Sequence, residues 1–136
     1  STQLRQGKRA MPPAPKLILV VDDDNAVRTL VCKSLVEAGY EVADAADGLA
    51  ASTLLDQLQR LPNLVICDVM MPAIDGFSFA KLLRSKKELS SIPIIFLTAR
   101  ASPQEVVKGI QAGARHYVTK PFSMKDLLAK VAKSLA

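Results

Sequence analysis

The sequence has few aromatic residues, a single histidine and only two cysteines. Aromatic residues make up 4% of the chain and tryptophan is absent, which argues against an aromatic stacking platform for single-stranded nucleic acid. His116 is the only histidine, so a histidine-rich metal site is excluded. Cys32 and Cys67 form neither a C-x-x-C motif nor a disulfide framework. We therefore expect a reducing, cytoplasmic location.

Long hydrophobic runs are also missing. The longest apolar run near the start, Leu17–Val21, is far too short for a membrane span or the core of a signal peptide. Hydrophobic residues nevertheless make up 49% of the 136 positions. This is enough for a buried core, and the length suits one domain.

The net charge of +5 is concentrated at the beginning of the chain. Residues 1–16 hold four basic residues and no acidic one, whereas residues 17–136 hold 14 basic and 13 acidic residues. The excess therefore gives no support for nucleic-acid binding by the folded part. Residues 1–15 end in a proline-rich stretch and lack apolar periodicity, so we expect a disordered or extended leader, either native or an expression remnant. Residues 16–136 form the expected domain.

Strand-like apolar runs alternate with segments of helical periodicity through this domain. The expected strands are about 17–21, 40–44, 64–67, 94–97 and 116–118. The expected helices are about 25–38, 48–60 and 77–87, a fourth that begins with a capping box at Ser102, and a fifth that begins at Ser123. This spacing is typical of parallel strands joined by crossover helices.

The character of the strands predicts their order in the sheet. The strands at 17–21, 64–67 and 94–97 are continuously apolar, which predicts burial on both faces. The strands at 40–44 and 116–118 are partly polar, so we expect them at the edges. These positions match a doubly wound α/β fold with a five-stranded parallel sheet of order 2-1-3-4-5. A ligand is expected at the carboxyl ends of strands 1 and 3, where the chain connections diverge.

Polar residues follow four of these strands at their carboxyl ends. Asp22–Asp24 follow the first strand, Asp68 the third, Thr98 the fourth and Lys120 the fifth. Taken singly, each has an ordinary interpretation, such as a helix cap at Asp24 or Asn25 or a solvated loop lysine. Together they place carboxylates, a hydroxyl and an amine at one edge of the sheet. Clustered carboxylates favour a cation, and oxygen ligands suit Mg²⁺. The set is typical of phosphoryl transfer to a carboxylate.

Four segments carry a resemblance to a known family. They are Leu17–Asp24, Asp68–Gly76, Phe96–Ala99 and His116–Phe122. With these motifs the chain resembles the receiver domain of bacterial two-component response regulators, over residues 16–136. The resemblance implies the flavodoxin-like fold of CheY-like proteins.

The resemblance also implies a role for each acidic residue. Asp68 would be the phosphoacceptor. Mg²⁺ would be bound by Asp23, Asp68 and the backbone carbonyl of Met70, with Asp22 acting through a bound water. The Lys120–Pro121 peptide bond is commonly cis in this family.

The remaining roles that the resemblance implies concern the phosphoryl group and the switch. Lys120 would pair with Asp68 and then with the phosphoryl group, whose oxygens Thr98 and the Ala99 amide would hold. Tyr117 matches the aromatic switch residue that turns inward as Thr98 moves toward the phosphoryl group.

The expected function is that of a phosphoacceptor switch, which catalyses only its own phosphorylation and dephosphorylation. Its expected partners are a sensor histidine kinase or phosphotransfer protein as donor, a downstream effector, and a second copy in a phosphorylation-dependent homodimer. Neither nucleic acid nor a membrane is expected to bind directly. The expected readout surface comprises about 102–112, 115–118 and 123–135. The sequence leaves open the cognate kinase and whether the receiver stands alone or belongs to a longer regulator.

Two other functions remain as alternatives. One is a small Mg²⁺-dependent phosphatase with an Asp-x-Asp nucleophile, whose spacing Asp22 and Asp24 satisfy, although Ala26 stands where Thr or Val is expected. The other is flavin binding on the same fold, which an acidic first loop disfavours because it would repel the flavin phosphate.

Overall fold

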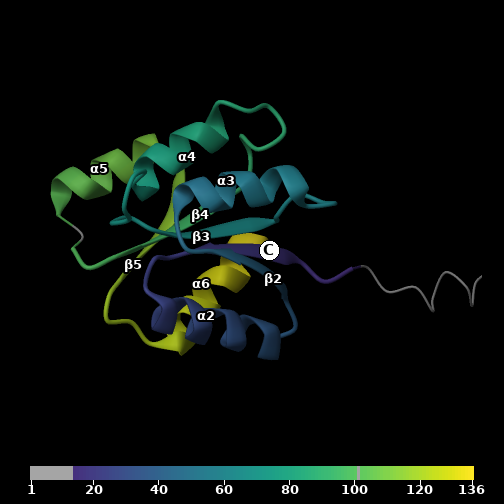
Figure 1. The fold of residues 1–136 in the computed structure, drawn as a ribbon. Helices are drawn as coiled ribbons and strands as arrows, with labels where there is room; N and C mark the ends of the chain where they lie inside the picture. Colours follow the sequence, from purple (N-terminus) through teal and green to yellow (C-terminus); the bar gives the residue numbers. More distant parts are fainter. Residues whose placement is uncertain (1–13, 101) are drawn as a thin grey trace, which may run out of the picture.

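A computed structural model describes residues 14–100 and 102–136 of the chain. Most of the expected leader, residues 1–13, therefore lies outside the described residues. The described part is a parallel β-sheet covered by helices on both faces (Figure 1). Within it, no helix has both the length and the apolar character needed to cross a membrane.

The sheet has five parallel strands. They are β1 (Leu17–Val21), β2 (Glu41–Ala45), β3 (Leu64–Asp68), β4 (Ile94–Thr98) and β5 (Ala114–Thr119). Their order is β2-β1-β3-β4-β5, which confirms the expected topology. Every residue of β1, β3 and β4 is buried, whereas β2 and β5 are partly exposed, as the polarity of their sequences predicts.

Two layers of helices cover the sheet. The helices are α2 (Asn25–Glu37), α3 (Gly48–Gln57), α4 (Gly76–Arg84), α5 (Pro103–Gln111) and α6 (Met124–Leu135). In Figure 1, α2 and α6 cover one face of the sheet, and α3, α4 and α5 cover the other. Each face has its own hydrophobic core. Val31 and Leu127 are fully buried in the first core, and Phe79 and Phe96 in the second.

Each helix begins at a side chain that caps it. The capping residues are Asp24, Asp47, Asp75, Ser102 and Ser123, and each accepts a hydrogen bond from a backbone amide of the first turn. The caps at Asp24, Ser102 and Ser123 agree with the sequence-based expectation. Because a cap satisfies an amide that no helical carbonyl can reach, these residues fix where each loop at the carboxyl edge of the sheet ends.

Several element boundaries differ from those expected from the sequence. The second strand is 41–45 rather than 40–44, and the fifth extends over 114–119. Helix α3 ends at Gln57, because Leu58 turns to an extended conformation and packs against the core. Helix α4 ends at Arg84, and the turns that follow bury Leu89 and Ile92. In both cases, tertiary packing of an apolar residue ends a helix that its periodicity would have continued.

Candidate functional site

The candidate site lies at the carboxyl edge of the sheet, between β1 and β3. Val21 of β1 pairs in register with Cys67 of β3, so the next residues, Asp22 and Asp68, lie side by side. Asp68 in turn pairs with Leu97 of β4, which places Thr98 beside the same edge. The topology thus brings together the polar residues that the sequence places at the ends of separate strands.

Three carboxylates form an acidic cluster at this edge. Oxygen atoms from Asp22, Asp23 and Asp68 all lie within 4.8 Å of one another. Asp22 is fully buried and Asp68 is only 5% exposed, whereas Asp23 is exposed to solvent. A cluster of oxygen donors that is open on one side fits Mg²⁺, which prefers carboxylates and retains several water ligands.

The pKa of Asp68 is raised to about 7. Burial is the main cause, and the negative charge of Asp22 adds to it, while the positive charge of Lys120 opposes it. Asp23 also raises this pKa, because its side chain can accept a hydrogen bond from the protonated form of Asp68, and the Met70 amide, 3.4 Å from Asp68 Oδ1, lowers it. The ionised carboxylate of Asp68 therefore has too little positive charge around it, which is the condition that a bound cation relieves.

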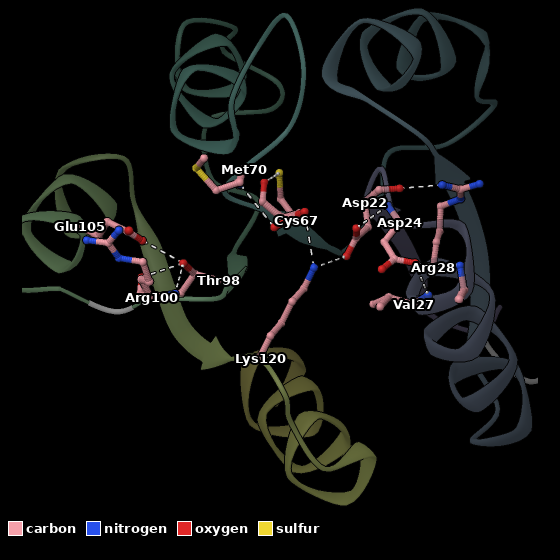
Figure 2. A network of polar contacts seen from close by, with 12 residues as sticks. Asp22, Asp24, Val27, Arg28, Cys67, Met70, Thr98, Arg100, Glu105 and Lys120 are labelled. Carbon is pink, nitrogen blue, oxygen red and sulfur yellow. Dashed lines mark hydrogen bonds and ion pairs between the residues drawn. The ribbon is translucent and has the colours of Figure 1, made fainter.

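Lys120 directly follows the carboxyl end of β5, and its side chain extends to the cluster. Its Nζ lies 3.1 Å from Asp22 Oδ2 (Figure 2). The same Nζ lies 3.5 Å from Asp68 Oδ2. Burial lowers the pKa of Lys120, but the hydrogen bonds and charges of the two carboxylates outweigh it and hold the pKa above its usual value. The Lys120–Pro121 peptide bond is cis. The expected pairing with Asp68 is present, and Lys120 is shared with Asp22.

Arg28 of α2 supports the acidic loop and was not singled out from the sequence. Its Nη1 donates to the backbone carbonyl of Asp22 at 2.6 Å, and its Nε pairs with Asp44 Oδ2 of β2 at 2.9 Å. Asp22 Oδ1 also accepts from the Asp24 amide at 2.9 Å. The position of Arg28 four residues after the helix cap at Asp24, on the turn nearest the loop, is the signal that could have revealed it.

Thr98 lies at the end of β4 and is 1% exposed, but its hydroxyl faces α5. Its Oγ1 lies 2.7 Å from the carbonyl oxygen of Arg100 and 2.8 Å from Oε1 of Glu105 (Figure 2). The Arg100 amide donates back to Oγ1 at 3.1 Å. Ala99, whose amide is expected from the sequence to hold a phosphoryl oxygen, follows directly and is exposed. The contact between Thr98 and Glu105 was not anticipated, because the sequence showed Glu105 only as part of a capping box.

Tyr117 of β5 is half-buried against β4 and α5. Its ring packs at a tilt against Phe96, with 5.6 Å between the ring centroids. Its hydroxyl donates to the backbone carbonyl of Glu105 at 2.7 Å. Thr98 and Tyr117, the two residues expected from the sequence to form the switch, therefore contact the same residue of α5.

Comparison with known proteins identifies the family. The model of the response regulator receiver domain matches residues 18–132. The chain is 41% identical over 114 residues to the DNA-binding dual master transcriptional regulator RpaA of Synechocystis, covering 84% of this chain and 46% of that protein. It thus spans about half the length of the curated relatives it matches.

Two solved structures show the same fold. The chemotaxis protein CheY4 of Vibrio cholerae superposes with a TM-score of 0.84 at 35% identity, covering 90% of this chain and all of that one. The receiver domain of the sensor histidine kinase PA1611 of Pseudomonas aeruginosa has a TM-score of 0.79 at 29% identity, covering 90% and 98% of the two chains, and holds a magnesium ion in its active-site cleft. The chain therefore belongs to the family of response regulator receiver domains, the phosphoacceptor signalling switches of two-component systems.

Proposed function

We propose that Asp68 is the phosphoacceptor of this receiver domain, which spans residues 16–136. The observation that carries the proposal is the place of Asp68 in the acidic cluster. It ends the central strand β3, lies against a second buried carboxylate and has the amine of Lys120 3.5 Å away. A carboxylate in this position can act as a nucleophile toward phosphorus.

The proposed reaction is phosphoryl transfer from a phosphohistidine donor. One carboxylate oxygen of Asp68 attacks phosphorus and the P–N bond breaks, so the electron pair stays with the imidazole and an acyl phosphate forms on Asp68. Lys120 pairs with the transferred group, and Thr98 and the Ala99 amide hold two of its oxygens. Hydrolysis by water returns the carboxylate and releases phosphate, so the domain acts only on its own acyl phosphate.

The residues present fit a magnesium ion. We propose that Asp23, Asp68 and the backbone carbonyl of Met70 would hold it, with Asp22 acting through a bound water. When bound, the ion would offset the negative charge of the carboxylates and of the phosphoryl oxygens. Two observations support this assignment, namely the three carboxylates within 4.8 Å and the magnesium ion in the related PA1611 receiver.

The proposed partners are a histidine kinase or phosphotransfer protein as donor, and a downstream protein as receptor of the signal. The readout surface is the face formed by α5, β5 and α6, where phosphorylation-dependent pairing of two copies would also occur. RpaA is a DNA-binding regulator, but this chain matches only 46% of it. DNA binding is therefore not proposed for this receiver domain.

The phosphatase alternative gains no support from the geometry. Its nucleophile would be Asp22, which is fully buried and already bonded to the amide of Asp24 and to Lys120. An attacking carboxylate needs an oxygen open to the substrate. Both oxygens of Asp22 are occupied by these two contacts and the residue is 0% exposed, whereas Asp68 retains an exposed fraction of 5%.

Phosphorylation with a small donor tests the proposal. Incubation with acetyl phosphate and Mg²⁺ should add one phosphoryl group, measured by intact-protein mass spectrometry. Asp68→Asn should abolish this labelling, and so should chelation of the metal. Asp56→Asn, at an exposed position of α3, is the matched control and should be labelled normally. Labelling of the Asp68→Asn variant at the level of the control would overturn the assignment.

A further inference from the structure

The hydroxyl of Thr98 has one proton, and the structure directs it away from the acidic cluster. Both acceptors near Oγ1, the Arg100 carbonyl at 2.7 Å and the Glu105 carboxylate at 2.8 Å, lie on the α5 side. A hydroxyl donates one hydrogen bond at a time. Thr98 therefore cannot donate to a phosphoryl oxygen on Asp68 while it donates to either acceptor, and the charged Glu105 carboxylate is the stronger acceptor of the two.

Glu105 also connects this hydroxyl to β5 and to the beginning of α5. Its backbone carbonyl accepts from Tyr117 Oη at 2.7 Å. Its amide donates to Ser102 Oγ at 3.2 Å, which is the cap of the helix. One residue in the first turn of α5 thus contacts the side chain at the end of β4 and the aromatic side chain of β5.

The place of Tyr117 depends on the absence of a side chain one turn further along α5. A Cβ atom at Gly109 would collide with the hydroxyl and ring of Tyr117. Gly109 is buried, so the ring fills the space that the glycine leaves. The helix, Tyr117 and Thr98 therefore form one connected arrangement, in which Glu105 makes both polar contacts.

We propose that Glu105 is a positioning residue that holds Thr98 and Tyr117 in the unphosphorylated arrangement, and that a phosphoryl group on Asp68 competes with the Glu105 carboxylate for the Thr98 hydroxyl. The inference rests on the proposed function of Asp68. Release of Thr98 from Glu105 would free the first turn of α5, which belongs to the proposed readout surface. Glu105 therefore opposes phosphorylation of Asp68, and the loss of its contact with Thr98 passes the conformational change to α5.

Glu105→Gln tests this with little change in size. A hydrogen bond to a charged acceptor is stronger than one to a neutral acceptor by ~1 kcal/mol, which corresponds to a factor of about five. The variant should therefore bind beryllofluoride, a mimic of the phosphoryl group, with a half-saturating concentration about fivefold lower in the presence of Mg²⁺. An unchanged or higher concentration would overturn the proposal.

Tyrosine fluorescence provides the readout, because the chain has no tryptophan and only two tyrosines. In a Tyr40→Phe background, Tyr117 is the only fluorophore of this kind. Without beryllofluoride, Glu105→Gln should already shift the Tyr117 signal toward the value of the saturated protein. Glu88→Gln removes the same charge from an exposed position between α4 and β4, at the opposite end of the sheet, and should change neither quantity.

A double-mutant cycle separates a specific contact from a general effect of charge. In a Thr98→Val background there is no hydroxyl to release, so Glu105→Gln should no longer change the half-saturating concentration. An effect equal to that seen with Thr98 present would overturn the proposal. Asp68→Asn distinguishes the two levels of inference. If this variant responds to beryllofluoride like the parent, the proposed function fails, whereas a parent response that Glu105→Gln leaves unchanged contradicts only the role of Glu105.

Discussion

Replacing the proposed phosphoacceptor should make the metal-free protein more stable. The ionised carboxylate of Asp68 is almost fully buried beside Asp22, and burial together with this like charge raises its pKa from 3.8 to about 7. Such a rise corresponds to ~4 kcal/mol of cost to the folded state once the group is ionised. Relaxation around the site reduces this figure. We therefore expect Asp68→Asn to raise the free energy of unfolding by about 2–4 kcal/mol at pH 8.

The sign of the pH dependence follows from the direction of the shift. Because the folded pKa lies above the unfolded value, the unfolded chain releases the Asp68 proton first as the pH rises. The parent protein therefore loses stability between about pH 4 and pH 7, and the loss levels off above the folded pKa of about 7. Asp68→Asn has no such titration, so the difference in stability should be small near pH 4 and largest above pH 7. The shift of His116 does not involve Asp68 and is common to both proteins, and Lys120, whose pKa is raised above its usual value, stays protonated over this pH range.

Urea unfolding followed by circular dichroism measures the difference. The two proteins are compared in EDTA at several values from pH 5 to pH 8, and then with excess Mg²⁺. Magnesium should stabilise the parent by mass action and should stabilise the variant much less. The difference in the free energy of unfolding between the two proteins should therefore become smaller. Asp56→Asn controls for the loss of an exposed charge and should change the free energy of unfolding by ~0.5 kcal/mol or less. An Asp68→Asn variant that is less stable than the parent in EDTA at pH 8 would refute the reasoning.

Two further predictions concern the connection from β3 into the first residue of α4. Ala73 has a φ of 67°, a left-handed conformation that is costly for a residue with a Cβ, so Ala73→Gly should raise the free energy of unfolding by ~0.5–1 kcal/mol in urea titrations. No gain would contradict this account of the strain. The second prediction concerns Gly76, where a Cβ atom would collide with the backbone carbonyl oxygen of Asp68 and lie 2.9 Å from Val69 Cα. Gly76→Ala should therefore lower the free energy of unfolding by ~2–3 kcal/mol. The substitution should also weaken Mg²⁺ binding measured by calorimetry. A variant with the parent's free energy of unfolding and Mg²⁺ affinity would contradict the prediction, because the backbone would then have moved to accommodate the Cβ atom.

The order of the strands could be predicted because burial leaves a direct trace in the sequence. Leu64–Cys67 has no polar residue, which is expected of a strand covered on both faces, and this places it in the interior of the sheet. The acidic cluster could be predicted for a related reason. Parallel strands have their carboxyl ends at one edge, so Asp22 and Asp68 had to lie close together once the order was known.

The contact of Thr98 with Glu105 and that of Lys120 with Asp22 could not be predicted in the same way. Both residues were placed at the correct edge, but the direction of a side chain depends on which partner is nearest in space. Glu105 lies seven positions after Thr98, and Asp22 lies 98 positions before Lys120. No local pattern records such a pairing. The ends of α3 and α4 were missed for a similar reason, because they depend on which later residue packs into the core.

The shared position of Lys120 has a consequence for the role of the divalent cation. Its Nζ lies 3.1 Å from Asp22 and 3.5 Å from Asp68. One positive charge is therefore shared by two carboxylates, that of Asp22, which is fully buried, and that of Asp68, which is nearly so. A phosphoryl group on Asp68 would add a charge of about −1.5 to −2 and draw the amine toward its oxygens. Asp22 would then lose its closest cation while the negative charge beside it increased. A divalent cation in the cluster offsets both changes at once, so phosphorylation should depend on the cation more steeply than the charge of Asp68 alone would require.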